Sequence, residues 1–251
     1  MNDKYLQAIA RYAEAHGGLR PVPRAVLFDM DGVLFDSMPL HARSWSEVCA
    51  KYGLPMRPLE AFMHEGRTGA STINILSQRH RHRDATPEEV AEIYADKCAL
   101  FNTYPAAPKM AGAEQLLAKV RADGLTIVVV TGSGQATLLR RLQTNFPGFF
   151  AEHLVVSSKD VKHGKPDPEP YLMGLAKAGV AAHEALVVEN APLGVKAAHA
   201  AGIFTIAVNT GPLPPEALTE EGADLLLPSM QALAEAWPCL YHTLRQNTTL
   251  S

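Results

Sequence analysis

FDMDGVLFDS, residues 28–37, places two aspartates directly after an apolar run. The run Ala25–Phe28 predicts a buried strand, and Asp29 and Asp31 follow it two positions apart. Side chains at this spacing on an extended chain point the same way, so both carboxylates are expected to crowd one spot at the strand end. Like charges so close destabilise one another unless one takes a proton or a cation lies between them. The stretch therefore predicts a proton or a cation at this strand end.

The segments after this first strand change in character along the chain. Residues 39–105 carry only helical patterns, whereas helical and strand patterns alternate from Met110 onward. The elements expected in this second part are helices at 112–122, 135–145, 168–178 and 192–200 and strands at 125–130, 153–156, 185–188, 203–208 and 224–227. Such alternation implies a parallel sheet with helices on both faces. We therefore expect an α/β fold, a Rossmann-like parallel sheet core with an inserted all-helical cap domain.

The same patterns give the expected domain boundaries. The expected parts are an N-terminal helical extension at 1–20, a core at 21–36 and 106–251, and a helical cap at 37–105. The extension reads as an amphipathic helix because Tyr5, Ile9 and Tyr12 fall at helical spacing before Gly17. The biased run RHRHRD at 79–84 is expected to be a solvated loop, and a metal or phosphate site is the less favoured alternative.

Composition and charge exclude several classes of protein. The 251 residues carry 26 acidic and 23 basic side chains, so the net charge of −3 indicates neither a nucleic-acid binder nor a protein of anionic membranes. The 3 cysteines are far apart and have no CxxC spacing, which argues against a disulfide framework and a zinc site and fits a reducing compartment. The apolar run Leu125–Val130 is too short to span a bilayer, and residues 1–20 lack the apolar block of a signal peptide. We expect a cytoplasmic protein with a small-molecule partner. The sequence leaves the oligomeric state open, and we favour a monomer.

Polar side chains follow four successive strands of the predicted sheet. Asp29 and Asp31 follow the first strand, Thr131–Gly134 the second, Lys165 lies in the loop after the third, and Glu189–Asn190 follow the fourth. Each set alone has an ordinary explanation as a turn, a helix cap or a surface residue. Because the carboxyl ends of parallel strands meet at one edge, where ligands bind, the four sets are expected to surround one opening.

The ligand types at this opening predict phosphate chemistry. Oxygen ligands without histidine or cysteine suit Mg²⁺ together with the phosphate of a substrate. Asp29 can then be a nucleophile that forms an aspartyl-phosphate, and Asp31 can protonate the leaving oxygen and later deprotonate a water. Lys165 and the Thr131 hydroxyl, with the backbone N–H of Gly132, are expected to bind phosphoryl oxygens. The sequence therefore predicts a Mg²⁺-dependent phosphohydrolase.

Four motifs resemble the haloacid dehalogenase (HAD) superfamily, in its β-phosphoglucomutase-like branch with a helical cap. They are, in the family's order, DMDGVLFDS, VVVTGSG, GKPDPEPYL and VVENAPLGVKAAHAAG. The resemblance implies that Asp29 is the nucleophile, that Asp31 is the acid/base and offers its carbonyl to Mg²⁺, and that Glu189 and Asn190 belong to the metal site. Asn190 departs from the family, which usually has aspartate there, and its neutral oxygen is a poorer Mg²⁺ ligand.

A cap segment, MHEGRTGAST at 63–72, offers a further acid, Glu65, followed by Gly66. The glycine allows a close approach to the core when the cap shuts, although Glu65 can also be an ordinary exposed carboxylate at a helix end. With NFPGFF and ENAPLG, this segment resembles the bacterial inorganic pyrophosphatases of the same branch. That resemblance implies that Glu65 and Asn190 both belong to the magnesium site. Inorganic pyrophosphate is therefore the expected substrate.

The alternative is a β-phosphoglucomutase or a small sugar-phosphate phosphatase. His41 matches the histidine that gates the acid/base aspartate in the mutases. However, Gly69 stands where the mutases carry an arginine for a second phosphate, and Arg67 is the candidate substitute.

Two other classes of protein are weakly supported by the sequence. TGSGQAT, residues 131–137, imitates part of a dinucleotide-binding motif, but Thr137 replaces the third glycine and no strand ending in an acid follows at the required distance. A catalytically silent binding module is disfavoured because Asp29, Asp31 and Lys165 are all present.

Overall fold

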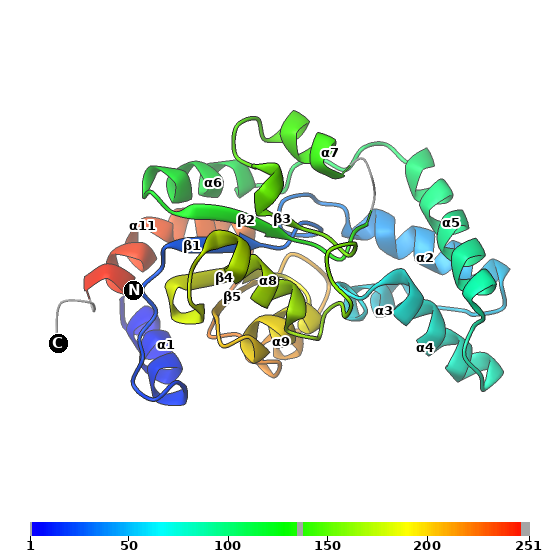
Figure 1. Cartoon of the computed structure of the whole chain (residues 1–251), viewed down its shortest axis with the longest axis horizontal. Coiled ribbons are helices and arrows are strands. Elements are labelled where there is room, and N and C mark those ends of the chain that lie inside the picture. Colours follow the sequence, from blue (N-terminus) through cyan, green and yellow to red (C-terminus); the bar gives the residue numbers. More distant parts are fainter. Residues whose placement is uncertain (1, 135–137, 247–251) are drawn as a thin grey trace.

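The sheet of the protein has six parallel strands in the order β3-β2-β1-β4-β5-β6 (Figure 1). The computed structural model describes residues 2–134 and 138–246. The strands are β1 (Ala25–Phe28), β2 (Thr126–Val130), β3 (Val155–Val156), β4 (Ala185–Glu189), β5 (Phe204–Val208) and β6 (Leu225–Leu227). Every residue of β1, β4 and β5 is buried, as expected for a sheet covered on both faces. This confirms the predicted α/β class.

Helices cover both faces of the sheet, and successive residues of β1 alternate between them. Val26 and Phe28 pack with α1, α6, α7 and α11, whereas Ala25 and Leu27 pack with α8 and α9. These helices are α1 (Asn2–Ala15), α6 (Ala113–Ala122), α7 (Leu138–Asn145), α8 (Glu169–Ala178), α9 (Pro192–Ala200) and α11 (Met230–Gln246), with the short α10 (Glu216–Thr219) beside α9. None of the helices within the described ranges has the length and apolar character needed to cross a bilayer.

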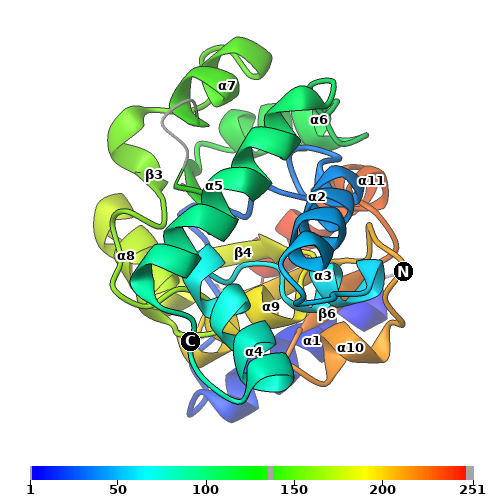
Figure 2. The ribbon, with the colours of Figure 1, turned by 90° about the vertical axis from the view of Figure 1, so that its right-hand side faces the viewer.

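The chain between β1 and α6 forms a helical cap beyond the carboxyl ends of the strands (Figures 1 and 2). Its helices are α2 (Met38–Lys51), α3 (Pro58–Met63), α4 (Gly69–Arg81) and α5 (Pro87–Thr103). They have an apolar core of their own, which includes Val48, Ile73 and Leu76. The predicted insertion of an all-helical cap into a parallel sheet core is therefore confirmed, while the boundaries proposed at 36/37 and 105/106 stay a prediction.

Three parts of the chain differ from the sequence-based expectation. The predicted strand 153–156 has only two residues in the sheet, because Glu152–Leu154 form a 3₁₀ turn before β3. The predicted helix 135–145 is seen from Leu138 to Asn145, and its residues 135–137 lie outside the described ranges. Helix α11 was not predicted. It contains Pro238, yet its apolar residues recur at helical spacing and pack against α6 and α1.

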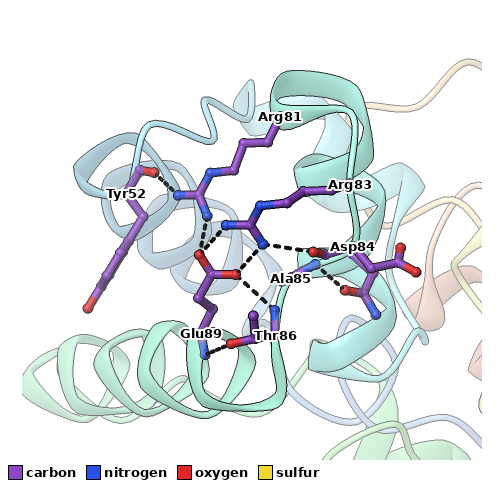
Figure 3. A network of polar contacts seen from close by, with 8 residues as sticks. Tyr52, Arg81, Arg83, Asp84, Ala85, Thr86 and Glu89 are labelled. Carbon is purple, nitrogen blue, oxygen red and sulfur yellow. Dashed lines mark hydrogen bonds and ion pairs between the residues drawn. The ribbon is translucent and has the colours of Figure 1, made fainter.

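The biased run RHRHRD, expected to be a solvated loop, is only partly a loop, because its residues 79–81 form the last turn of α4. The run stabilises the turn between α4 and α5 (Figure 3). Arg81 and Arg83 both donate hydrogen bonds to the Glu89 carboxylate, and Arg81 also donates to the backbone carbonyl of Tyr52. Glu89 in turn accepts a hydrogen bond from the Thr86 backbone N–H and completes a capping box. Arg79 pairs with Glu60 in the same way, so all three arginines of this run ion-pair within the cap, which accounts for them without a metal or a phosphate.

Helix α1 is attached to the core at the end of the sheet away from the cap (Figure 1). The Tyr12 hydroxyl donates to the carbonyl of Gly202 at 2.7 Å, and Arg11 donates to the carbonyl of Asp224 at 3.0 Å. The Asp224 carboxylate accepts a hydrogen bond from the Thr205 backbone N–H at 2.7 Å. Burial raises the pKa of Asp224 to about 6, against the weaker opposing effects of that hydrogen bond and of nearby basic side chains.

This raised pKa predicts that Asp224 makes stability depend on pH. The native state holds the proton more tightly than the unfolded chain, so the contribution of Asp224 to stability falls as pH rises from about 4 to about 6. Asp224→Asn keeps the acceptor for Thr205 and removes this titration. The thermal midpoint of the wild type should therefore fall relative to the variant by roughly 2–8 °C between pH 4 and pH 7. Parallel midpoint curves for the two proteins would contradict the assignment.

Candidate active site

The first strand delivers two buried aspartates to the edge of the sheet. The Asp29 backbone N–H continues the strand ladder by donating to Val188, and Asp29 and Asp31 are only 2% and 5% exposed. Gly32 then turns the chain with φ of +87°, and a Cβ at this position would overlap the Asn190 amide. A glycine is therefore required here for two reasons, the left-handed backbone and the contact with the end of β4.

One buried ammonium group joins two of the carboxylates. Lys165 Nζ donates to Asp29 Oδ1 at 2.6 Å, to Glu189 Oε1 at 2.7 Å and to the carbonyl of Val130 at 3.2 Å. Its side chain and both carboxylates are almost completely buried. Lys165 thus connects the ends of β1, β2 and β4 and fixes one oxygen of Asp29.

Glu189 is held by its neighbours on both oxygens. Oε1 accepts from Lys165 and from the Tyr171 hydroxyl, and Oε2 accepts from the backbone N–H groups of Asn190 and Ala191. A carboxylate has about four acceptor positions, and all are in use. The sequence predicted Glu189 as a metal ligand, but this arrangement favours a different role, in which Glu189 positions Lys165. Gly194 leaves the necessary room, since a Cβ there would overlap the Glu189 carboxylate.

Two buried oxygen atoms at this edge have no hydrogen-bond partner among the described residues. They are Asp29 Oδ2 and Asn190 Oδ1, from the ends of β1 and β4. Leaving buried polar atoms unpaired is costly unless a ligand satisfies them. Hard oxygen atoms of this kind suit Mg²⁺, so the residues present fit the predicted ion.

The charges around these oxygens also favour a cation. Burial raises the pKa of Asp29 to about 8, and the neighbouring Glu189 and Asp31 carboxylates add to this effect while Lys165 opposes it. Burial likewise raises the pKa of Glu65, with Asp31 and Asp29 as the next largest causes. The four carboxylates Asp29, Asp31, Glu65 and Glu189 therefore outnumber the ammonium groups of Lys165 and Lys97 beside them, and a divalent cation would relieve their repulsion.

Asp31 lies in a separate hydrogen-bonding environment. Its Oδ1 accepts from the Ser37 hydroxyl at 2.5 Å and lies 3.4 Å from His41 Nε2. Burial acts to raise the pKa of Asp31, but His41, Ser37 and Arg141 outweigh it and hold that pKa well below its ordinary value. On the other side of the imidazole, Lys97 Nζ lies 2.8 Å from His41 Nδ1. An ammonium group only donates, so Nδ1 accepts and the ring proton is on Nε2, directed at Asp31.

The cap closes over this edge through contacts that require glycine. A Cβ on Gly66 would lie 2.8 Å from Lys165 Cδ, and a Cβ on Gly132 would lie 3.0 Å from the carbonyl oxygen of Gly66. Between cap and core remains a cavity of about 50 Å³, which has room for only a few water molecules. Its lining includes Asp31, His41, Glu65, Arg67, Lys97 and Gly132.

The structure brings the predicted residues together in two adjoining places. Asp29, Lys165, Glu189 and Asn190 meet at the sheet edge, where Thr131 is also buried at the end of β2. Asp31, His41, Glu65, Arg67 and Gly132 line the cavity. The sequence reasoning did not identify Ser37, Tyr171 or Lys97. Ser37 and Tyr171 lie inside quoted motifs, but Lys97 looks like a surface lysine of a helix, and nothing local marks it as buried.

Comparisons with known proteins agree with this geometry. The family model described as "Haloacid dehalogenase-like hydrolase" matches residues 26–208. The chain therefore belongs to this family, as the motifs indicated, and its relatives place it among the β-phosphoglucomutase-like members. It is similar to hexitol phosphatase A of Escherichia coli, with 34% identity over 84% of this chain and 93% of that protein. It also resembles a phosphorylated carbohydrates phosphatase of Thermotoga maritima, with 30% identity over 81% of this chain and 93% of that protein.

A solved structure gives the same result for the fold. It is described as "Putative beta-phosphoglucomutase from Bacteroides vulgatus" and shares 54% identity and a TM-score of 0.95, covering 98% of this chain and 100% of that one. These findings place the protein among the phosphatases and phosphomutases of the family, which act on small phosphorylated compounds. The names of these relatives support the sugar-phosphate alternative better than pyrophosphate hydrolysis, which none of them mentions.

The position of Glu189 leads to a prediction about Gly194. Gly194→Ala should displace the Glu189 carboxylate and with it Lys165, which lowers kcat/KM on p-nitrophenyl phosphate by roughly 10- to 100-fold. Gly179→Ala is the matched control, because its Cβ would meet nothing within 4 Å and only its backbone φ of +66° is unfavourable. Full turnover in a folded Gly194→Ala protein would show that Lys165 does not depend on Glu189.

Proposed function

We propose that the protein hydrolyses a small phosphate compound through an aspartyl-phosphate on Asp29. The observation that carries this proposal is the state of the Asp29 carboxylate, with one oxygen fixed by Lys165 and the other buried without a partner. An oxygen of Asp29 attacks phosphorus and the bond from phosphorus to the leaving oxygen breaks. Asp31 has to take up a proton before this step, because its lowered pKa leaves it ionised, and it then passes that proton to the leaving oxygen. Water then attacks the aspartyl-phosphate, Asp31 takes its proton, and phosphate is released.

The residues that would hold Mg²⁺ are Asp29, Asp31 through its backbone carbonyl, Asn190 and Glu65. The bound ion would offset the negative charge of the carboxylates and of the phosphoryl oxygens. Thr131, Gly132 and Lys165 bind and orient the phosphoryl group from the core. Glu189 acts on the site through Lys165, and His41 through Asp31.

Phosphorylated carbohydrates are the first substrate candidate, because the named relatives act on them. A β-phosphoglucomutase activity belongs to the same candidate class, since the Bacteroides vulgatus relative carries that description. The cavity of about 50 Å³ has room for only a few water molecules, so the cap would have to open further than in this structure to admit a sugar phosphate, as it would for any phosphate compound.

Inorganic pyrophosphate is the second candidate, and the position of Glu65 favours it. This cap acid is close enough to Asp31 and Asp29 for their charges to raise its pKa, so it can join the same ion as Asn190. A metal ligand in the cap occupies the space that a large leaving group needs. Pyrophosphate has a small leaving group, and its oxygens can themselves bind the metal.

We also propose a reducing cytoplasm as the location and a monomer as the working form. Cys49, Cys98 and Cys239 are all free thiols, which supports a reducing compartment.

The proposed nucleophile can be tested with an isosteric change. Asp29→Asn should lower turnover by several orders of magnitude, because an amide of the same size does not attack phosphorus. The assay should compare hexitol phosphates, hexose 6-phosphates, β-glucose 1-phosphate, pyrophosphate and p-nitrophenyl phosphate, with and without EDTA. Loss in chelator and recovery with Mg²⁺ are expected. One tenth of the wild-type rate in Asp29→Asn would remove Asp29 from this role, and the best substrate of the panel decides between the candidates.

Glu65 separates the two substrate candidates. If it completes the metal site, Glu65→Ala should lower pyrophosphate hydrolysis by at least roughly 10-fold, raise the Mg²⁺ concentration needed for half activity, and affect p-nitrophenyl phosphate less. Adding Asn190→Asp should restore part of the Mg²⁺ affinity, a non-additive effect expected only if both residues bind one ion. An unchanged Mg²⁺ dependence in Glu65→Ala, with pyrophosphatase rates at the wild-type level, would contradict the role of Glu65 in the metal site. Sugar phosphates would then be the remaining substrate candidate.

A further inference from the structure

The cap contacts the core at two places on the sheet edge. At one of them, the segment after α3 lies against the loop that follows β2, where a Cβ on Gly132 would lie 3.0 Å from the carbonyl oxygen of Gly66. At the other, the Phe62 ring of α3 lies against Gly211 in the loop that follows β5. A Cβ on Gly211 would lie 3.0 Å from Phe62 Cδ1 and 3.2 Å from Phe62 Cε1, so this contact is as close as the first.

The strand order places the candidate metal site between the two contacts. β1 and β4 lie between β2 and β5, so the ends of the strands that carry Asp29 and Asn190 are flanked by the two contacted loops. Phe62 and Gly66 are four residues apart in the cap, and Glu65 lies between them in the chain. The segment that carries Glu65 is therefore held at both ends while it crosses this edge.

We propose that Phe62 is a positioning residue, whose contact with Gly211 fixes how far the closed cap descends and so places Glu65 over the ends of β1 and β4. This inference rests on the proposed function, in which Glu65 binds Mg²⁺. Phe62 also packs against the apolar core of the cap, so the contact with Gly211 orients the whole cap rather than one side chain.

The loop after β5 is itself held firmly by the core. The Thr210 hydroxyl donates to the carbonyl of Gly32 at 2.7 Å, and the side-chain amide of Asn209 donates to the carbonyl of Leu213 at 3.0 Å. Gly32 belongs to the turn that directly follows the proposed acid/base residue. The surface that Phe62 contacts is therefore a fixed part of the core and is bonded to the active-site turn.

The contact explains why residue 211 is a glycine. Its φ lies outside the left-handed region, so the backbone does not require glycine there. Apart from its chain neighbours, only the Phe62 ring among the described residues comes within 4 Å of a Cβ at this position. Mg²⁺ demands near-ideal geometry and short bonds, so a methyl group that moves the cap by a few tenths of an ångström should weaken the bond from Glu65 to the ion.

The test uses Gly211→Ala, which adds one methyl group against the Phe62 ring without backbone strain. Mg²⁺ affinity is measured by calorimetric titration of the substrate-free protein, and circular dichroism checks the fold. Gly211→Ala should weaken Mg²⁺ binding roughly 10-fold, the order of loss when a group that orients a metal ligand is disturbed. Adding Phe62→Leu makes room for the methyl group and should restore the affinity to within about 3-fold of the wild type, a compensation expected of residues in contact.

A combination with Glu65→Ala shows whether the contact acts through Glu65. Glu65→Ala alone should weaken Mg²⁺ binding, and adding Gly211→Ala should cause no further loss, because the ligand that the contact positions is already gone. Leu59→Ala is the matched control. It removes an exposed apolar side chain from the same helix and should leave the Mg²⁺ affinity unchanged.

Wild-type Mg²⁺ affinity in Gly211→Ala would overturn the inference, and so would a loss that Phe62→Leu does not reverse or that persists in full beside Glu65→Ala. If Gly211→Ala does not fold, Phe62→Ala removes the contact from the cap side, and wild-type affinity in that variant would overturn the inference equally. Failure of the proposed function gives a different result. Wild-type Mg²⁺ affinity in Glu65→Ala would refute the metal role of Glu65, and the positioning role of Phe62 with it.

Discussion

The site depends on one constraint, the burial of the Asp29 and Glu189 carboxylates on the ammonium of Lys165, with further acids close by. Asp29 and Glu189 each bind it at 2.7 Å or less, and Glu65 approaches from the cap. So much buried negative charge is unfavourable by itself, and it is tolerated only where hydrogen bonds and a cation compensate for it. The parallel strand order supplies the geometry, because β1 lies between β2 and β4 and all three end at the same edge.

Close backbone contacts give this charge cluster its shape. Gly32 and Gly194 leave space for the side chains of Asn190 and Glu189, and Gly66 and Gly132 let the cap descend onto Lys165. A methyl group at any of these positions would push apart groups that must lie within hydrogen-bond distance. The site therefore needs the charged side chains of Asp, Glu and Lys and also needs glycine at the positions that contact them. This explains why the sequence motifs combine Asp, Lys and Gly.

The sequence alone predicted those features that depend on periodic patterns or on residues close together in the chain. The α/β class, the helical insert and the acids after β1 follow from periodicity and from the position of polar residues after strands. The commitment of Glu189 to Lys165 was not predictable, because it depends on Tyr171 and Gly194, which reach it only in the folded chain. Lys97 was missed for a similar reason, since its burial results from the packing of α5 against α2. Helix α11 was missed although its periodicity is present, and Pro238 does not interrupt it.

The chain leaves the core and returns to it at almost the same point. Asp36 N–H donates to the carbonyl of Pro108 at 3.0 Å, and Met110 N–H donates to the carbonyl of Leu34 at 2.9 Å, so the departing and returning segments are paired. No strand pairing of the sheet includes a residue from 38–103. Since the two ends of the insert already meet, its length costs the core little conformational entropy. The cap is in this sense modular: evolution can exchange or enlarge it, and so alter what the enzyme accepts, without rebuilding the part that performs phosphoryl transfer.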